Sequence, residues 1–334
     1  MNKFYSLNIK EINTLTSDSV EIKFDIPSDI AEKFKFKAGQ YITIRNNIDG
    51  EEIRRSYSLC SDPNTNEIAV GVKRVEGGKM STFLTKEIKI GDILEVMPPT
   101  GNFIFEGGNV VAICAGSGIT PILSMIKSSN AEFTLIYGNK TIESSMFYDE
   151  IKEINSDNHF VFSREEVEGC FHSRINDSVI ETVLQGDFKN RVFYICGPGE
   201  LIDNTKKFLI KNGVKTSDIF FERFTSVKKK DAVNKSETDE IICNIIVIMD
   251  GDEFEYTLSS RGDTILDSAM DEGADVPFSC KGAVCCTCKA KVMEGKAIMD
   301  KNYSLSEQEV EEGYILTCQS HPITENIIVD FDEM

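Results

Sequence analysis

Five of the ten cysteines lie within residues 280–318, and their spacing constrains the fold more than any other feature. Cys280, Cys285 and Cys288 form a C-x4-C-x2-C pattern, and Cys318 follows thirty residues after Cys288. This spacing is typical of plant-type [2Fe–2S] sites, in which four thiolates hold the cluster. The intervening glycine lets three thiolates and several backbone N–H groups converge. The pattern therefore predicts an iron–sulfur site with these four cysteines as its ligands.

A zinc knuckle is the alternative, because cysteine thiolates also bind zinc. Zinc sites commonly present two C-x2-C pairs or histidines, whereas this region has a single C-x2-C. Cys286 is left out of the ligand set because counting it breaks the plant-type spacing. The remaining cysteines stand singly among apolar residues, which is typical of buried, unreactive thiols: Cys60, Cys114, Cys170, Cys196 and Cys243.

The hydrophobic pattern divides the 334 residues into parts, and a chain of this length suggests about two or three domains. Residues 1–105 contain short apolar and β-branched runs between turn signals, which predicts a small antiparallel barrel or sandwich. Residues 106–224 alternate apolar runs with helical patterns, which predicts βαβ units around a parallel sheet. Residues 225–240 are polar and predict a linker. Residues 241–334 combine β runs, a helix and the cysteine-rich stretch.

Several elements can be placed within these parts. Strands are expected at 41–44, 56–60, 68–75, 93–97, 110–114, 133–137, 160–162, 192–196, 241–249, 253–258 and 327–330. Helices are expected at 121–127, 145–154, 200–212 and 264–270. Ser306 and Glu309 form a capping box that predicts a further short helix.

Charge and hydropathy exclude some classes of protein. The net charge is −19, and residues 241–334 hold 19 acidic and 6 basic side chains, a net charge of −13. Binding to nucleic acid needs a basic surface, so this chain is not expected to bind it. No apolar run approaches 18 residues, and the N-terminus has no signal-like core. We therefore expect a cytoplasmic protein that does not enter membranes.

Six motifs occur together and in order: MPPTGNF, CAGSGITP, FSREE, ICGP, FERF and CKGAVCCTCKAKVMEGKAIMDKNYSL. With these motifs the chain resembles the ferredoxin–NADP reductase superfamily in its form fused to a C-terminal plant-type ferredoxin domain. Within it, the chain most resembles the reductase subunits of bacterial phenylacetyl-CoA epoxidases. The resemblance implies a FAD-binding antiparallel β-barrel at 1–105 and an α/β nucleotide-binding domain at 106–224. It also implies an α+β, β-grasp ferredoxin domain at 241–334.

The resemblance also implies flavin-binding residues. Arg55 is expected near the flavin phosphates, Tyr57 on the ring, and Ser58 beside the ring nitrogen N5, with Ser56 between them. A second segment is expected to hold the pyrophosphate at a helix N-terminus: Val72, Lys73, Gly78, Lys79, Met80, Ser81 and Thr82. The choice of FAD over FMN follows from the resemblance alone.

The nicotinamide site is expected after two strands of the parallel sheet. Glycines in the first turn allow close approach of a phosphate, and the residues concerned are Gly116, Gly118, Thr120 and Pro121. The resemblance places Cys196, Gly197 and Pro198 beside the nicotinamide, and Glu222 and Phe224 near the flavin. Ser58, Cys196 and Glu222 are the expected catalytic residues.

The residues after the third strand bear on the choice of nicotinamide. Ser163 and Arg164, with Arg174 further on, offer a hydroxyl and cations to a 2′-phosphate, which favours NADPH over NADH. The alternative is that Ser163 and Glu166 form a capping box that starts a helix. The phosphate site and the capping box can exist together, although Glu165 and Glu166 would repel a phosphate.

The resemblance implies electron transfer from NADPH to FAD, then to the [2Fe–2S] cluster, then to a separate oxygenase. No histidine has a glutamate three positions before it, so a carboxylate di-iron centre is expected on another polypeptide. The expected partner is a di-iron epoxidase acting on the ring of phenylacetyl-CoA. The alternatives are another oxygenase, a desaturase or a soluble ferredoxin as acceptor, or an iron–sulfur redox sensor without turnover.

Overall fold

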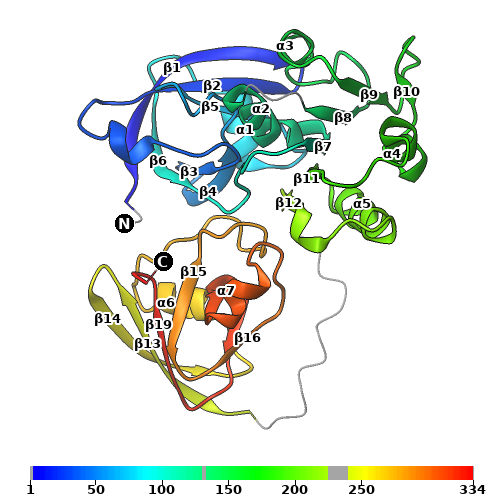
Figure 1. Ribbon diagram of the computed structural model, residues 1–334. Coiled ribbons are helices and arrows are strands. Elements are labelled where there is room, and N and C mark those ends of the chain that lie inside the picture. Colours follow the sequence, from blue (N-terminus) through cyan, green and yellow to red (C-terminus); the bar gives the residue numbers. More distant parts are fainter. Residues whose placement is uncertain (1–2, 130–132, 225–239, 334) are drawn as a thin grey trace. The chain divides into compact units, whose positions relative to one another are not determined.

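The computed structural model describes residues 3–129, 133–224 and 240–333. The chain divides into two compact units, one of which spans Phe4–Phe224 while the other contains the C-terminal residues (Figure 1). Each unit has its own hydrophobic core. The predicted linker, apart from Glu240, lies outside the described residues.

The N-terminal part of the first unit is an antiparallel barrel. Its strands are β1 (Tyr5–Thr16), β2 (Ser19–Asp25), β3 (Tyr41–Ile48), β4 (Glu51–Ser58), β5 (Ile68–Lys73) and β6 (Ile93–Thr100). They pair in the order β4-β3-β6-β1-β2-β5, and a bridge between Leu59 and Val70 joins the two edges. Helix α1 (Lys79–Lys86) follows β5 and buries Met80 and Leu84. Joining the edges protects these strands from pairing with another chain.

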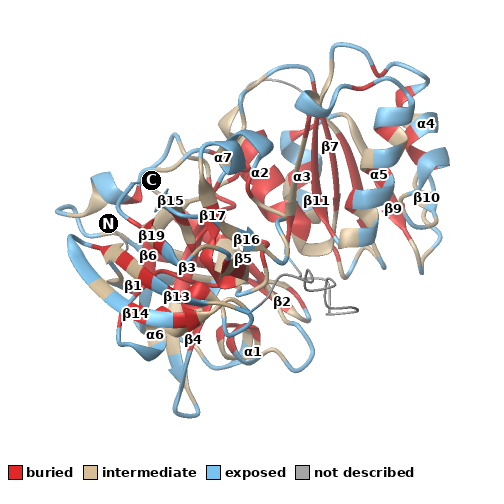
Figure 2. Ribbon diagram, turned by 90° about the horizontal axis from the view of Figure 1, so that it is seen from below, coloured by how far each residue is buried: buried red, intermediate tan, exposed pale blue. Residues whose placement is uncertain are grey.

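The second part is a parallel sheet with helices on both faces (Figure 2). Its strands are β7 (Val110–Ala115), β8 (Thr134–Asn139), β9 (Asn158–Phe162), β10 (Phe171–His172), β11 (Val192–Gly197) and β12 (Ile219–Arg223). Its helices are α2 (Ile119–Ser128), α3 (Tyr148–Ile154), α4 (Asp177–Leu184) and α5 (Gly199–Lys211). Alternate residues of β7 enter the core shared with α2 and α3, and the others enter the core shared with α4 and α5. Burial on both faces explains the continuous apolar runs.

The strand order is β10-β9-β8-β7-β11-β12, so the chain winds outward from β7 in both directions. The turns after β7 and β11 therefore leave the sheet side by side at its carboxyl edge. In open α/β sheets this switch point is where ligands bind.

The C-terminal unit is an α+β domain. Its main sheet has the order β14-β13-β19-β15-β17, with β13 and β19 parallel. The strands are β13 (Ile242–Met249), β14 (Asp252–Ser259), β15 (Lys289–Glu294), β17 (Tyr314–Leu316) and β19 (Asn326–Asp330), with a small pair β16 (Ala297–Met299) and β18 (Ser320–Pro322). The helices are α6 (Ile265–Asp271) and α7 (Glu307–Glu311). The cysteine-rich loop lies between α6 and β15.

The predicted fold class is confirmed in all three parts. Nine of the strands and α-helices named above were not anticipated: β1, β2, β10, α4, β12, β15, β16, β17 and β18. Helix α3 begins at Tyr148 instead of residue 145, because Ser145 donates a hydrogen bond to the Thr141 carbonyl at 2.8 Å and closes a turn there. The capping box of Ser306 and Glu309 forms with both of its hydrogen bonds. In the described parts of the chain, no helix is long and apolar enough to cross a membrane.

Candidate functional site

The three residues expected to be catalytic lie where the barrel meets the parallel sheet. Ser58 ends β4, and its hydroxyl donates to Oε2 of Glu222 in β12 at 3.1 Å. Cys196 in β11 is the register partner of Glu222 across the parallel pair. The fold therefore brings together side chains that are up to 164 residues apart in sequence.

Burial makes this group electrically neutral near pH 7. Burial raises the pKa of Glu222 to about 8, although the hydrogen bond from Ser58 acts to lower it. Burial, with a contribution from the Glu222 carboxylate, also raises the pKa of Cys196 well above its ordinary value. A protonated carboxyl and a thiol can donate hydrogen bonds without placing a fixed charge beside a flavin.

The raised pKa of Glu222 predicts a pH-dependent stability. The group binds its proton more tightly in the folded chain, so stability falls as the pH rises from about 4.5 towards 8. Glu222→Gln is expected to flatten this decline and to raise stability at pH 8 by about 1–3 kcal/mol. Stability is measured by urea unfolding at pH 5 and at pH 8, with the release of FAD as the signal. The exposed Glu153→Gln serves as the control, and an equal decline in wild type and Glu222→Gln contradicts the assignment.

The glycine-rich turn after β7 packs against the end of β11. Residues Gly116–Gly118 form a single 3-10 turn that leads into α2. A Cβ added to Gly118 would lie 2.2 Å from the Cys196 carbonyl oxygen, so only glycine fits. The Thr120 hydroxyl donates to the Ser117 carbonyl at 3.0 Å. The turn thus leads into the buried first turn of α2, where the Ile119 N–H bonds to the carbonyls of Gly116 and Ser117. The N-terminus of a helix favours phosphate.

The expected flavin segments border the same region. Tyr57 is half-buried on β4, and Ser56 shares a hydrogen bond with Thr43 at 3.2 Å. Gly78 precedes α1, where the Ser81 hydroxyl accepts from the Val75 N–H at 3.1 Å and shapes the turn.

Three of the expected flavin cations have neighbours of their own. Lys73 on β5 donates to the Ser144 carbonyl at 3.1 Å, and Lys79 pairs with Glu51 at 2.5 Å. Arg55 donates to the Arg54 carbonyl at 2.7 Å and is exposed. The carboxylates of Asp18 and Glu51 therefore partly neutralise the charges of Lys73 and Lys79. Val72, Met80 and Thr82 carry no charge, so they can contribute to flavin binding mainly through backbone groups or packing.

The capping-box interpretation of Ser163 and Glu166 is wrong, because no helix begins there. Instead, the N–H groups of Ser163 and Arg164 donate to the carbonyls of Asn139 and Lys140 at 3.0 and 2.9 Å. Glu165 accepts from the Ile142 N–H at 2.7 Å. These bonds tie the turns after β8 and β9 together and leave the Arg164 side chain exposed.

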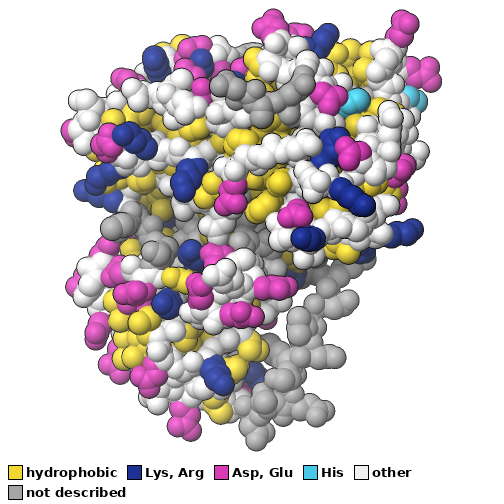
Figure 3. Space-filling view, viewed as in Figure 1, with side chains coloured by type: hydrophobic (Ala, Val, Ile, Leu, Met, Phe, Trp, Pro, Cys, Tyr) yellow, Lys and Arg dark blue, Asp and Glu magenta, His cyan; other side chains and the backbone are white. Residues whose placement is uncertain are grey.

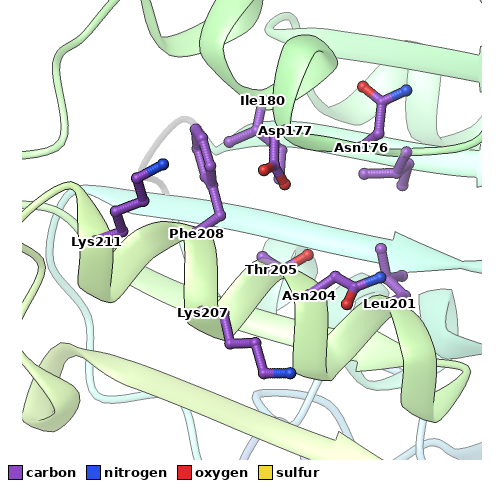
Figure 4. A pocket seen from close by; sticks show the side chains of 10 residues that line it. Asn176, Asp177, Ile180, Leu201, Asn204, Thr205, Lys207, Phe208 and Lys211 are labelled. Atoms are coloured by element: carbon purple, nitrogen blue, oxygen red, sulfur yellow. The ribbon is translucent and has the colours of Figure 1, made fainter.

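A groove of about 350 Å³ lies between the segment from Ile175 through the first turn of α4 and one side of α5 (Figure 4). Ile180, Leu201 and Phe208 give it apolar walls, while Asn176 and Asn204 add amides. Its size is within the range of small-molecule sites.

The four predicted cysteine ligands form two thiol pairs in the C-terminal unit. Cys285 lies 3.1 Å from Cys280, sulfur to sulfur, and Cys288 is hydrogen-bonded to Cys318. Hydrogen bonds from Cys285 and from backbone N–H groups lower the pKa of Cys280. No three such side chains stand at the spacing of a single metal ion within the described residues. Two thiols per iron is the arrangement of a [2Fe–2S] cluster, whereas zinc needs four ligands around one ion.

The backbone of the cysteine loop also fits a cluster. Lys281 and Ala283 adopt positive φ angles of 45° and 64°. The Gly282 N–H donates to Cys280 Sγ at 3.3 Å, and the Ala283 N–H reaches Cys318. N–H groups aimed at sulfur stabilise the negative charge of thiolates.

Sequence reasoning missed two supporting residues. The buried Tyr137 hydroxyl donates to the Gly116 carbonyl at 3.1 Å, and the buried Thr317 hydroxyl donates to the Cys288 carbonyl at 2.9 Å. Both act on backbone carbonyls of distant segments, so no local motif signals them. Phe224, expected near the flavin, is exposed at the end of the first unit's described residues.

Three family descriptions match consecutive parts of the chain. The oxidoreductase FAD-binding domain family matches residues 6–105, and the oxidoreductase NAD-binding domain family matches residues 112–207. The 2Fe-2S iron-sulfur cluster binding domain family matches residues 247–322. The chain is 36% identical to a subunit of the 1,2-phenylacetyl-CoA epoxidase of Escherichia coli (strain K12), with 99% of both chains covered. It is 29% identical to the ferredoxin reductase component of 3-ketosteroid-9-alpha-monooxygenase of Rhodococcus rhodochrous, covering 97% of this chain and 96% of that relative.

The solved structure of phthalate dioxygenase reductase shares the fold, with a TM-score of 0.63, 23% identity and 98% of both chains covered. The chain therefore belongs to the family of electron-transfer reductases that join FAD-binding, NAD-binding and [2Fe–2S] domains in one polypeptide. It is an oxidoreductase, and the resemblance found in its sequence is confirmed.

Proposed function

We propose that this protein is the reductase component of a phenylacetyl-CoA epoxidase, and that it passes electrons from NADPH to a separate di-iron oxygenase. The observation that carries the proposal is the 36% identity to a phenylacetyl-CoA epoxidase component along the full length of both chains. FAD accepts a hydride and can release electrons singly, and the [2Fe–2S] cluster carries one electron at a time. The protein supplies position, orientation and electrostatics.

The roles proposed for individual residues follow from their places in the fold. Ser58 and Glu222 would hydrogen-bond near the reacting edge of the flavin, while Gly118 would let the turn after β7 pack against the end of β11, beside the nicotinamide. The first turns of α1 and α2 would hold the flavin and nicotinamide phosphates. Cys280, Cys285, Cys288 and Cys318 would hold the cluster.

Reconstitution tests the choice of acceptor. The proposal expects that the purified chain, mixed with an epoxidase oxygenase component and NADPH, supports epoxidation of phenylacetyl-CoA. Reduction of cytochrome c without any epoxidation would instead assign it to another oxygenase, a desaturase or a ferredoxin. A failure to turn over with either acceptor would leave the redox-sensor alternative.

The acidic C-terminal unit suggests that its contact with the oxygenase is electrostatically steered. Acidic side chains are spread over the visible face of this unit (Figure 3). Electron delivery is expected to slow as salt rises from about 0.02 to 0.3 M, where the Debye length falls from roughly 20 to 6 Å.

Two pairs of charge reversals test this steering. Glu307→Lys with Glu311→Lys is the test pair on α7; Glu309 is avoided because it pairs with Lys289 at 3.2 Å and closes the helix cap. Glu253→Lys with Glu255→Lys is the control pair. It makes the same change in charge on β14, which is an edge strand of the main sheet. We expect only the α7 pair to reduce the salt dependence of delivery. An unchanged salt slope in both pairs means that the charge serves solubility alone.

NADPH is the proposed donor because the turn after β9 presents an exposed Arg164 and a half-buried Ser163, with Arg174 ten residues after Arg164. The backbone N–H of Ile142 engages the Glu165 carboxylate, which reduces the repulsion that this residue would otherwise exert on a phosphate. We assign the adenosine end of the nucleotide to the groove between α4 and α5.

Arg164→Ala is expected to raise KM for NADPH by about 10–150-fold, corresponding to roughly 1.5–3 kcal/mol for a charge-assisted contact. The KM for NADH should hardly change, because NADH lacks the 2′-phosphate. Steady-state kinetics with a soluble dye measure both. Arg191→Ala, just before β11 at the opposite edge of the sheet, is the control. Equal loss with both nucleotides, or a native preference for NADH, refutes the assignment.

A further inference from the structure

The carbonyl groups of the cysteine loop are hydrogen-bonded from outside the loop. The Lys281 carbonyl accepts from Gln319 Nε2 at 3.3 Å, and the Cys288 carbonyl accepts from the Thr317 N–H at 3.1 Å. The Ala283 carbonyl accepts from the Tyr303 N–H at 3.2 Å, and the Cys285 carbonyl from the Ser304 hydroxyl at 3.1 Å. Residues near Cys318 thus hold both ends of the loop, and residues 303–304 hold its middle.

The segment 302–305 has a rigid structure of its own. The Asn302 side chain accepts from the N–H groups of Ser304 and Leu305, at 3.2 and 2.9 Å, and donates to the Leu305 carbonyl at 3.0 Å. Leu305 is buried in the core of the unit, and Tyr303 packs against that core. The segment can therefore act as a fixed support for the loop.

Cys286, the cysteine outside the ligand pattern, is part of the same contact. Its Sγ donates to the Ser304 carbonyl at 3.3 Å, while the Ser304 hydroxyl donates to the carbonyl of the neighbouring Cys285. Ser304 therefore accepts a hydrogen bond from Cys286 and donates one to Cys285, which ties the two segments together. A small, buried donor is what this position requires, and serine or cysteine can supply it.

We propose that Cys286 and Ser304 are positioning residues: Cys286 fixes Ser304, and the Ser304 hydroxyl holds the Cys285 carbonyl away from the sulfur ligands, so that the loop N–H groups point toward them. The inference rests on the proposed ligand set. Hydrogen bonds to cluster sulfur favour the reduced, more negative state, so this contact raises the reduction potential. It also restrains the loop against opening and losing the cluster.

The test uses the full-length holoprotein and four variants. Cys286→Ala and Ser304→Ala each remove one donor, whereas Cys286→Ser keeps a donor of similar size. Cys243→Ala is the matched control, because it removes a buried thiol from the same core without touching the loop. We measure the reduction potential of the cluster by a spectroelectrochemical titration, and the rate of bleaching with an iron chelator.

Cys286→Ala and Ser304→Ala should each shift the redox equilibrium three- to tenfold toward the oxidised state, about 30–60 mV for one electron, and bleach several-fold faster. Cys286→Ser should keep most of the wild-type values, and Cys243→Ala should keep the potential. Unchanged potentials in both alanine variants overturn the proposal, as does a Cys286→Ser variant that behaves like Cys286→Ala. Iron and sulfide analysis of the wild type tests the ligand set separately, since a chain without a cluster refutes that set and not the loop contact.

Discussion

Cys285→Ser is expected to abolish the visible iron–sulfur absorption while leaving NAD(P)H oxidation by a soluble dye near the wild-type rate. The wild-type chain should carry about two iron and two acid-labile sulfide with one FAD. Cys285 is buried and lies 3.1 Å from Cys280, so its loss would remove one of the two thiolates proposed for one iron. Dye reduction survives because the flavin and nicotinamide regions form a separate compact unit with its own cores.

Cys286→Ser is the matched control for this experiment, since it changes the neighbouring buried cysteine and leaves the four ligands in place. It should retain the cluster. Iron and sulfide analysis together with the absorption spectrum distinguishes the outcomes. One zinc per chain without iron–sulfur absorption would show that the cluster assignment is wrong. A Cys285→Ser protein with a full complement of iron and sulfide would remove Cys285 from the ligand set.

Gly118→Ala is expected to slow reduction of the flavin by NAD(P)H by about 10–100-fold while FAD content stays unchanged. The added Cβ would lie 2.2 Å from a backbone carbonyl, which no rotation of a side chain can relieve. The turn and the end of β11 must therefore move apart by about 1 Å, a displacement large enough to cost that much in a hydride transfer. Stopped-flow absorption of the flavin measures the rate.

Gly107→Ala is the control for this substitution. Gly107 precedes β7 at the far edge of the same sheet, and a Cβ there meets nothing within 4 Å. Its positive φ of 87° costs an alanine roughly 1–2 kcal/mol of stability but disturbs no ligand. Wild-type flavin reduction in Gly118→Ala would show that the two turns do not jointly form the nicotinamide site.

Much of the architecture could be predicted because it depends on short-range patterns. Runs such as Val110–Ala115 are apolar at every position because helices cover both faces of their sheet, and this pattern is readable without coordinates. The strands β1 and β2 were not anticipated, although both alternate apolar with polar residues, as at Leu7–Ile9 and Val20–Phe24. The alternative of a helix starting at Ser163 is wrong, because the N–H groups of Ser163 and Arg164 bond to the turn after β8 instead.

The sequence by itself determined the fold class, the spacing of the cysteines and the motifs that identify the family. These features are local, so spacing along the chain carries them. Only the tertiary structure decided that Ser58 meets Glu222, that Gly118 packs on Cys196 and that Ser304 supports the cysteine loop. Each of these contacts joins segments brought together by strand register and core packing. Such contacts depend on the whole fold, because no sequence pattern near either residue indicates which atom it will contact.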